Sequence, residues 1–294
     1  MDGQRATTLP GPTLIAHAGR AALLALVAGS AGAASTVLLP PARCSADGLH
    51  GDGFESALAE PSGGSGGATA EVLRTIEVPG FGPRNFYLYV PPAYNPAVPT
   101  PLVLLLHGQA NSQPGSTDLA ASGVRNQWSP AAVSQGFIVL APAGHTAQGA
   151  WDIPGSYPLI DAGIADTLAL YNIDRRRMYA WGFSAGANLL HALALSRSTQ
   201  LAAYAVHAGS LVRGAGIGAP AAAQRKLPVQ LWVGQSDSVY LPETMADRDV
   251  FASLGWTLDQ TLHYSVHSGG HNYDTTQFAT VWSRWCRFTV QPDS

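Results

Sequence analysis

The residues with the most evident chemistry form Gly182-Phe183-Ser184-Ala185-Gly186, in which a glycine lies two positions to each side of a serine. An apolar run, residues 178–181, precedes this segment, and an apolar run of helix length, residues 185–196, follows it. Glycines at these positions remove side chains that clash in a tight strand-to-helix turn, and such a turn exposes the serine hydroxyl. The segment predicts a nucleophilic serine, although with 32 glycines in the chain the bare pattern also fits an ordinary loop.

A serine hydroxyl needs a general base to become a nucleophile, and the base needs a group that orients it. His271 follows residues 262–267, whose alternating polarity is typical of a strand. Asp237 comes shortly after another apolar run, residues 229–233. The order serine, acid, histidine favours Ser184 as the nucleophile, Asp237 as the orienting acid and His271 as the base.

Other acids and histidines are alternatives for these roles. Asp237 also fits a turn-forming aspartate, because aspartate is common in turns. Three later acids remain as substitutes for it, namely Asp247, Asp249 and Asp259. Four other histidines are interpreted as structural, His263 and His267 as wall residues of a strand and His191 and His207 as core residues.

Acyl transfer also requires hydrogen-bond donors for a developing oxyanion. We expect one donor to be the backbone N–H of Ala185, directly after the serine. The other is expected from the backbone of Gln109, in the loop after the apolar run 102–106, where Gly108 allows a close approach. His107 is interpreted as a residue that shapes this loop.

The elements that would position these residues alternate along the chain. Strand-length apolar runs occur at residues 102–106, 137–141, 178–181, 203–207 and 229–233. Helix-length segments occur at residues 160–171, 185–196, 242–254 and 275–288. This alternation predicts an α/β fold with a mostly parallel sheet, edged by an antiparallel hairpin of residues 74–78 and 85–90. The serine then lies at the carboxyl end of a central strand, where open α/β sheets bind ligands.

The N-terminal region has a different composition from the rest. Arg20, the apolar run 21–27 and the small residues 31–33 predict a secretory signal over residues 1–33. The run is too short and too interrupted by glycine for a stable membrane span. Residues 34–70 are expected to form a flexible extension and linker, and residues 71–294 the catalytic domain. The expected location is secreted, extracellular or periplasmic.

Charge and composition exclude several kinds of function. Charged residues are 12% of the 294 residues and apolar residues 46%, which suits a sizeable core. The formal net charge of −3 gives no basic field for nucleic acid. No P-loop, dinucleotide fingerprint or zinc-type cysteine spacing is present, so we expect no cofactor and no metal.

Cysteine use is sparse, with only Cys44 and Cys286. In an exported protein such a pair predicts a disulfide, here between the N-terminal extension and the last helix. Two free thiols are one alternative. Lipid attachment at Cys44 is another, but Arg43 stands where a lipoprotein signal needs a small residue.

From about residue 71 onward the chain resembles the α/β-hydrolase fold, and more narrowly the secreted polyhydroxybutyrate depolymerase and feruloyl esterase group. The matching segments are RNFYLYVPPAYNPAVPTPLVLLLHG, DRRRMYAWGFSAGANLLHALA, VGQSDSV and SGGHNY. The resemblance implies the same triad and the same two oxyanion donors. The chain departs from the family pattern at Ala187, Gln109 and Asn272-Tyr273, where the family often has glycine, cysteine and Thr-Trp-Pro, and these departures leave the substrate open.

Features near the expected site bear on the substrate. The segment after the run 203–207 is too short for a lid, so we expect no cap domain and a bulky or polymeric ester substrate. Trp151 and Tyr273 are candidate substrate-binding residues, and each also fits an ordinary packed aromatic residue.

Three functions remain open from the sequence. The first is an extracellular serine carboxylesterase that acts on polyesters or on feruloyl or acetyl esters of plant polysaccharide. The second is a serine peptidase of the same fold. The third is a catalytically inactive surface binding protein, against which the intact Ser184, Asp237 and His271 argue.

Overall fold

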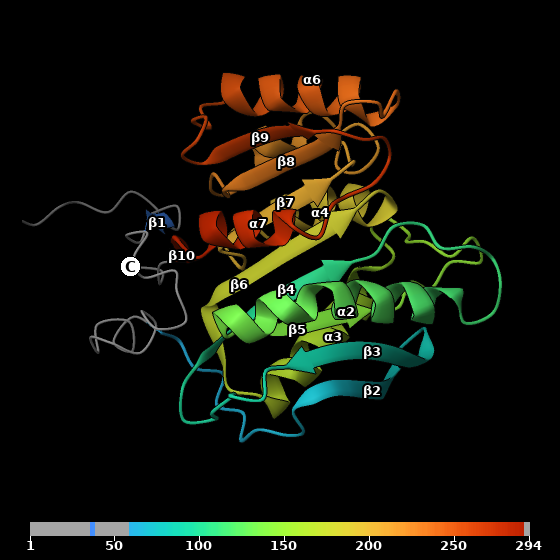
Figure 1. Ribbon diagram of the computed structural model, residues 1–294, viewed down its shortest axis with the longest axis vertical. Helices are drawn as coiled ribbons and strands as arrows, with labels where there is room; N and C mark the ends of the chain where they lie inside the picture. Colours follow the sequence, from blue (N-terminus) through green and yellow to red (C-terminus); the bar gives the residue numbers. More distant parts are fainter. Residues whose placement is uncertain (1–35, 39–58, 291–294) are drawn as a thin grey trace, which may run out of the picture. The chain divides into compact units, whose positions relative to one another are not determined.

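The computed structural model describes residues 36–38 and 59–290, and the expected signal segment 1–33 lies outside them. Within this part of the chain an eight-stranded sheet has the strand order β2-β3-β5-β4-β6-β7-β8-β9 (Figure 1). The strands of this sheet are β2 (Ala70–Val78), β3 (Gly82–Val90), β4 (Thr100–Leu106), β5 (Ile138–Pro142), β6 (Ile173–Phe183), β7 (Ala203–His207), β8 (Val229–Gly234) and β9 (Leu262–His267).

The pairing of these strands agrees with the expected mostly parallel sheet. Six neighbouring strands pair in parallel, in the order β5, β4, β6, β7, β8 and β9. The first two pair antiparallel, β2 with β3 and β3 with β5, so the predicted edge hairpin is confirmed. Every residue of β4, β5, β7 and β8 is buried, because helices cover both faces of the sheet centre.

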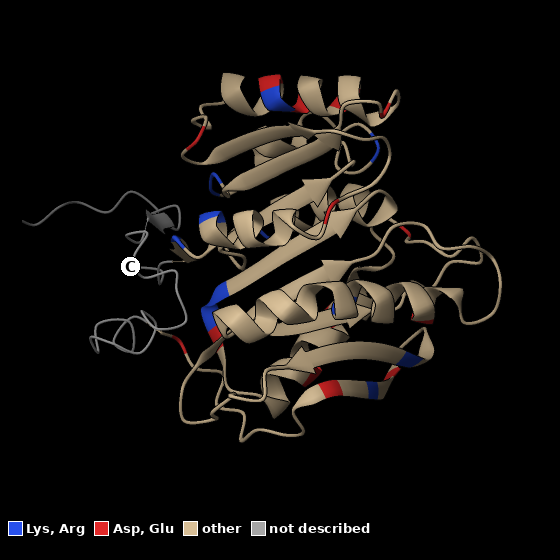
Figure 2. Cartoon of the chain, viewed as in Figure 1, with Lys and Arg blue, Asp and Glu red and all other residues tan. Residues whose placement is uncertain are grey.

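Two helical layers enclose the sheet. Their helices are α2 (Ser116–Gln135), α3 (Tyr157–Leu170), α4 (Ala185–Ser196), α5 (Ala219–Ala222), α6 (Tyr240–Ser253) and α7 (Gln277–Trp285). Buried residues of α3, α4 and α6 belong to one core cluster, and those of α2 and α7 to the other. Figure 1 shows α2 and α7 together in front of the sheet. Charges of both signs are scattered thinly over these elements (Figure 2).

Several expected bounds differ from the structure by a few residues, and one helix was not expected. Strand β6 begins at Ile173, earlier than the predicted 178, because the polar residues 174–177 continue the strand. The last helix ends at Trp285, and Phe288–Val290 form strand β10, which pairs with β1 (Thr36–Leu38) in a separate two-stranded sheet. Helix α2 was not predicted, since Gly123 and Pro130 interrupt its apolar pattern.

Part of the expected flexible linker is held in place. The backbone N–H of Ser62 donates to the carbonyl oxygen of Ile173 at 2.8 Å. The Ser62 hydroxyl donates to the Tyr171 carbonyl oxygen, also at 2.8 Å. A Cβ on Gly64 would lie 2.5 Å from the Tyr171 backbone, so this glycine packs directly against the chain. These residues therefore lie along the start of β6, despite their linker-like composition.

Candidate active site

Ser184 occupies a strained turn between β6 and α4. Its φ of 53° and ψ of −118° are uncommon for a residue with a side chain. A Cβ on Gly182 would lie 2.7 Å from the Gly186 carbonyl oxygen. A Cβ on Gly186 would lie 2.2 Å from the carbonyl oxygen of Leu106, at the end of β4. The two glycines thus allow backbone contacts that close the turn and hold the hydroxyl above the sheet edge.

The turns after β8 and β9 bring two further side chains to this serine. His271 Nε2 lies 2.8 Å from Ser184 Oγ. His271 Nδ1 lies 2.7 Å from Asp237 Oδ2. A carboxylate only accepts hydrogen bonds, so Nδ1 carries a proton and Nε2 is free to accept the serine proton. The three side chains selected in the sequence therefore form one continuous hydrogen-bonded chain.

Backbone contacts fix the two turns against each other. The N–H of Gln235 donates to the His267 carbonyl oxygen at 2.8 Å, and the N–H of Ser236 donates to that of Gly269 at 2.7 Å. A Cβ on Gly234 would lie 2.0 Å from the Gly270 carbonyl oxygen, so only glycine fits there. This contact sets the spacing between the acid and the histidine.

Asp237 is buried and remains suited to a charged role. Burial alone would raise the pKa of this carboxyl group. The N–H groups of Tyr240 and Val239 donate to Asp237 Oδ1 at 3.0 and 3.2 Å, and His271 donates to Oδ2. Together these donors outweigh burial and hold the pKa of Asp237 below its usual value. The carboxylate form is therefore available to orient the imidazole.

Two aromatic rings flank the histidine, and their role was not predicted from the sequence. The Tyr240 ring stacks on His271 with centroids 5.1 Å apart and an interplanar angle of 17°. The Phe183 ring lies at the same centroid distance with an angle of 34°. The Tyr240 hydroxyl accepts a hydrogen bond from Asn188 Nδ2 at 3.1 Å, and Arg213 lies over its ring at 5.3 Å. The imidazole is thus braced by rings as well as by Asp237.

The loop after β4 passes close to the serine. A Cβ on Gly108 would lie 2.8 Å from the Phe183 ring and 3.4 Å from Ser184 Cβ. Gln109, the next residue, is exposed, and its side-chain amide donates to the Gln148 carbonyl oxygen at 3.3 Å. Ala185 begins α4, and the first N–H groups of a helix have no acceptor within it. The two expected oxyanion donors therefore lie on segments that meet at Ser184.

His107 and Trp151 support this loop. The Gly144 N–H donates to His107 Nε2 at 2.9 Å, and His107 Nδ1 lies 2.6 Å from the Gly108 carbonyl oxygen. Burial lowers the pKa of His107, which favours the neutral ring that these contacts require. The Trp151 indole N–H donates to the His107 carbonyl oxygen at 2.9 Å, and Trp151 is only 9% exposed. These contacts favour the packing role of Trp151 over substrate binding.

Tyr273 anchors the turn that carries His271. Its hydroxyl donates to Gln127 Oε1 of α2 at 2.5 Å. Its ring packs on Trp181 and Phe183, with centroid distances of 4.9 and 4.8 Å. Burial raises the pKa of Tyr273 to about 12, so it stays neutral. The residue links the histidine turn to the α2 layer.

The alternative histidines and acids lie elsewhere in the fold. His207 is fully buried, accepts a hydrogen bond from Trp181 Nε1 at 2.8 Å, and burial lowers its pKa to about 3. His191 is also fully buried with a pKa of about 3, and its Nε2 lies 3.8 Å from Asp247. Among the remaining candidates, Asp249 pairs with Arg248, while Asp259 pairs with Arg284 and with the predicted wall residue His263.

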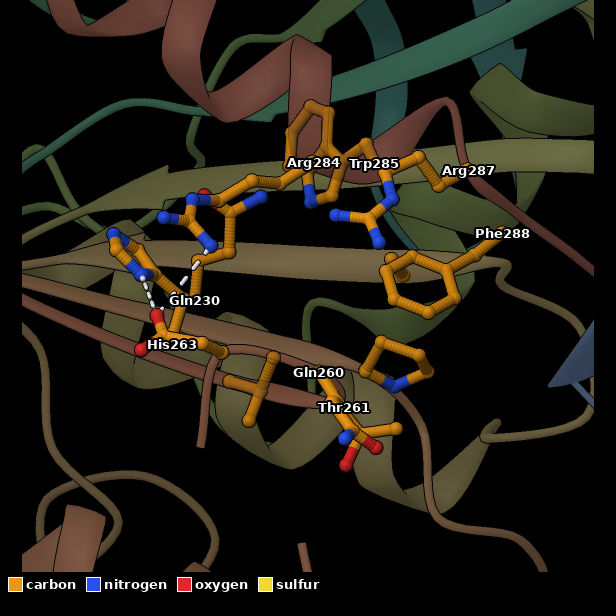
Figure 3. A pocket seen from close by; sticks show the side chains of 12 residues that line it. Gln230, Gln260, Thr261, His263, Arg284, Trp285, Arg287 and Phe288 are labelled. Atoms are coloured by element: carbon orange, nitrogen blue, oxygen red, sulfur yellow. Dashed lines mark ion pairs between the residues drawn. The ribbon is translucent and has the colours of Figure 1, made fainter. Parts of the chain in front are cut away.

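A small cavity lies at the opposite, amino edge of the sheet (Figure 3). Its volume is about 10 Å³, room for about one water molecule. His263 of β9 and Arg284 and Arg287 from the end of α7 line it. Since Asp237 and His271 follow the carboxyl ends of their strands, this cavity is separate from the candidate site.

Three further expectations concern metals, membranes and the disulfide. Among residues 36–38 and 59–290, no group of three or more His, Cys, Asp or Glu side chains is placed to hold a metal ion. No helix in the same part of the chain is long and apolar enough to cross a membrane. Cys286 is buried directly after α7, whereas Cys44 lies outside the described residues. The Cys44–Cys286 disulfide therefore stays a prediction.

Comparison with known proteins identifies relatives in sequence and in structure. No protein-family model matches the chain. The bifunctional acetylxylan esterase/xylanase XynS20E of Neocallimastix patriciarum is 32% identical over 161 residues, which cover 53% of this chain. The matched region is only 22% of that larger protein.

Three solved structures are similar to the chain. A thermostable esterase superposes with a TM-score of 0.58 at 20% identity, covering 74% of this chain and 63% of the esterase. A predicted dipeptidyl aminopeptidase IV from Bacteroides ovatus superposes with a TM-score of 0.57 at 15% identity, covering 75% of this chain and 36% of the peptidase chain. The poly(3-hydroxybutyrate) depolymerase LpqC from Bordetella parapertussis gives 0.55 at 18% identity, covering 74% and 90%. With its sheet order and strand-to-helix serine turn, the chain has the α/β-hydrolase fold.

Proposed function

We propose that this chain is a serine carboxylesterase that cleaves esters through an acyl-enzyme. The observation that carries the proposal is the continuous chain Ser184–His271–Asp237, with contacts of 2.8 and 2.7 Å. Its order and geometry are those of a nucleophile, a general base and an orienting acid. The similarity to an acetylxylan esterase/xylanase supports ester hydrolysis as the reaction.

In the proposed mechanism, His271 Nε2 takes the hydroxyl proton as Ser184 Oγ attacks the ester carbonyl. The backbone N–H groups of Gln109 and Ala185 hold the oxyanion, where one such donor typically contributes about 2.7–4 kcal/mol. The proton passes from His271 to the leaving alcohol. Water then attacks the acyl-enzyme with His271 as base, while Asp237 keeps the proton on Nδ1 throughout.

The proposed substrates are polyesters of the hydroxybutyrate type or feruloyl and acetyl esters of plant polysaccharide. The solvent-accessible site, with a His271 side chain that is 42% exposed, suits a bulky or polymeric ester. Such substrates lie outside the cell, which agrees with the predicted secretory signal and a secreted location.

A peptidase is the second candidate, because a predicted dipeptidyl aminopeptidase has the same fold. An inactive binding protein is the third. We propose to assay p-nitrophenyl acetate, methyl ferulate, acetylated xylan, a polyhydroxybutyrate suspension and an aminoacyl p-nitroanilide with wild type and Ser184→Ala. We expect the wild type to cleave at least one of the esters and Ser184→Ala to cleave none.

The other outcomes each select a different account. Cleavage of the anilide without any ester indicates a peptidase. A folded wild type that cleaves nothing supports the binding protein. Ester cleavage that persists in Ser184→Ala but disappears with a chelator contradicts the serine mechanism.

A further inference from the structure

An open groove lies beside α4, on the side of the sheet that also carries α3. Its volume is about 340 Å³, within the usual range of ligand sites. We call it the α4 groove. Its floor is formed by Ala192, Leu195 and Ser196 of α4, and its walls include Tyr157 at the start of α3 and Ala219 and Ala222 of α5.

The floor of the α4 groove lies along the helix that follows the nucleophile. Residues four apart are neighbours on a helix surface, so Asn188, Ala192 and Ser196 follow one another along α4, with a drift of about 40° around the axis at each step. At about 1.5 Å per residue, Ala192 and Ser196 lie roughly 12 and 18 Å along the axis from Ser184. The groove therefore follows α4 away from the reacting hydroxyl.

The near end of the groove is linked to the candidate active site through a series of residue contacts. Gly214 lines it, and a Cβ on this residue would lie 1.9 Å from the Asn188 carbonyl oxygen. The Asn188 side chain donates to the hydroxyl of Tyr240, whose ring stacks on His271. Two residues, Asn188 and Tyr240, thus lie between the Gly214 wall of the groove and the base.

The lining of the groove is uncharged and mostly aliphatic. Its only side-chain polar groups are the hydroxyls of Tyr157 and Ser196. On the segment that forms one wall, Val212 and Ile217 are 63% and 65% exposed, although neither lines the groove itself. A sugar chain would lose water from several hydroxyls here and find few partners, whereas an aliphatic ester chain loses little.

We propose that the α4 groove binds the aliphatic chain of a polyester beyond the ester bond being cleaved. This inference rests on the proposed esterase function and selects a polyester as its substrate. A chain that occupies the groove must extend about 12–18 Å from Ser184. Short esters therefore react without using the groove, and oligomers gain from it.

The test compares kcat/KM for p-nitrophenyl acetate with that for 3-hydroxybutyrate dimers, trimers and tetramers. We expect kcat/KM to rise with length, at about fourfold for each methylene-sized group that becomes buried. Ala222 is exposed and lines the groove, so Ala222→Trp should fill it without disturbing the core. In this variant the ratio of tetramer to acetate kcat/KM should fall about tenfold or more.

Ala221→Trp is the matched control, because Ala221 lies on the same short helix, is exposed and does not line the groove. It should leave the ratio unchanged. Equal effects of the two variants, or no length dependence in the wild type, would overturn the proposal. If Ala222→Trp lowered kcat/KM only for acetylated xylo-oligosaccharides, the choice of a polyester would be overturned.

Binding of the tetramer to Ser184→Ala separates this inference from the proposed function. We expect measurable binding that Ala222→Trp weakens about tenfold or more and Ala221→Trp does not. If no ester is cleaved but this pattern holds, the groove assignment stands and the esterase proposal fails. If esters are cleaved but Ala222→Trp leaves tetramer binding unchanged, the groove assignment fails alone.

Discussion

Replacing Gly186 by alanine should disturb the serine turn in a measurable way. The added Cβ would lie 2.2 Å from the Leu106 carbonyl oxygen and 2.5 Å from that of His107. An ordinary contact begins at 3.4 Å, so the start of α4 must move by about 1.2 Å from the end of β4. Neither carbonyl belongs to a flexible side chain, and the strain is therefore not relieved locally.

This displacement should lower both the stability and the activity of the protein. Overpacking of this kind lowers the free energy of unfolding by about 1–3 kcal/mol. For a domain of this size that lowers Tm by roughly 2–12 °C. The same movement separates Ala185 N–H from the loop that carries Gln109, and a misplacement of about 1 Å can lower kcat/KM by about 100-fold.

Gly123→Ala is the matched control, because Gly123 also lies in a helix but a Cβ there meets no atom within 4 Å. This variant should raise stability by about 0.5–1 kcal/mol and leave activity unchanged. Both variants are measured by thermal unfolding and by hydrolysis of p-nitrophenyl acetate. A Gly186→Ala protein with wild-type Tm and wild-type kcat/KM would refute the close-contact explanation of the turn.

Two further predictions concern groups around the site. Tyr240→Leu removes the ring stacked on His271 and should lower kcat by about 2–12-fold. Tyr240→Phe keeps the ring and should keep most of the activity. Equal losses of kcat in the two variants would contradict a role for stacking. Burial raises the pKa of Asp247 to about 7 in the folded protein, whereas in the unfolded chain this carboxyl releases its proton above about pH 4. Because the folded state binds the extra proton between these values, the contribution of Asp247 to the free energy of unfolding falls as pH rises from about 4 to 7. Asp247→Asn should flatten that fall in urea unfolding at pH 5 and pH 7.5, and an unchanged difference between the two pH values would contradict the assignment.

Much of the fold was predictable because its central strands are continuous apolar runs. The predicted bounds of β7, β9 and α4 match those observed. Helix α2 escaped prediction although its buried residues Ala121, Val124, Trp128 and Ala132 recur at helical spacing. Glycine, serine and an internal proline dilute that pattern, and packing against the sheet stabilises the helix in spite of them.

The positions of the triad residues were predictable, but the contacts that support them were not. The positions of Ser184, Asp237 and His271 at strand ends implied that they meet, since parallel strands place their carboxyl ends at one edge. The contact between Tyr240 and Asn188 was not predictable, because it joins α4 to the start of α6 through side chains. The contact of the Trp151 indole with the His107 carbonyl oxygen was not predictable either, because it joins residues 44 positions apart in the chain.

The central claim is that Ser184 is an activated nucleophile. The most direct measurement treats the folded protein with a fluorophosphonate and locates the adduct by intact mass and peptide mapping, with Ser184→Ala as the control. We predict a single adduct on Ser184 in the wild type and none in the variant. A folded wild type that takes up no adduct, or carries it on another residue, would contradict the account.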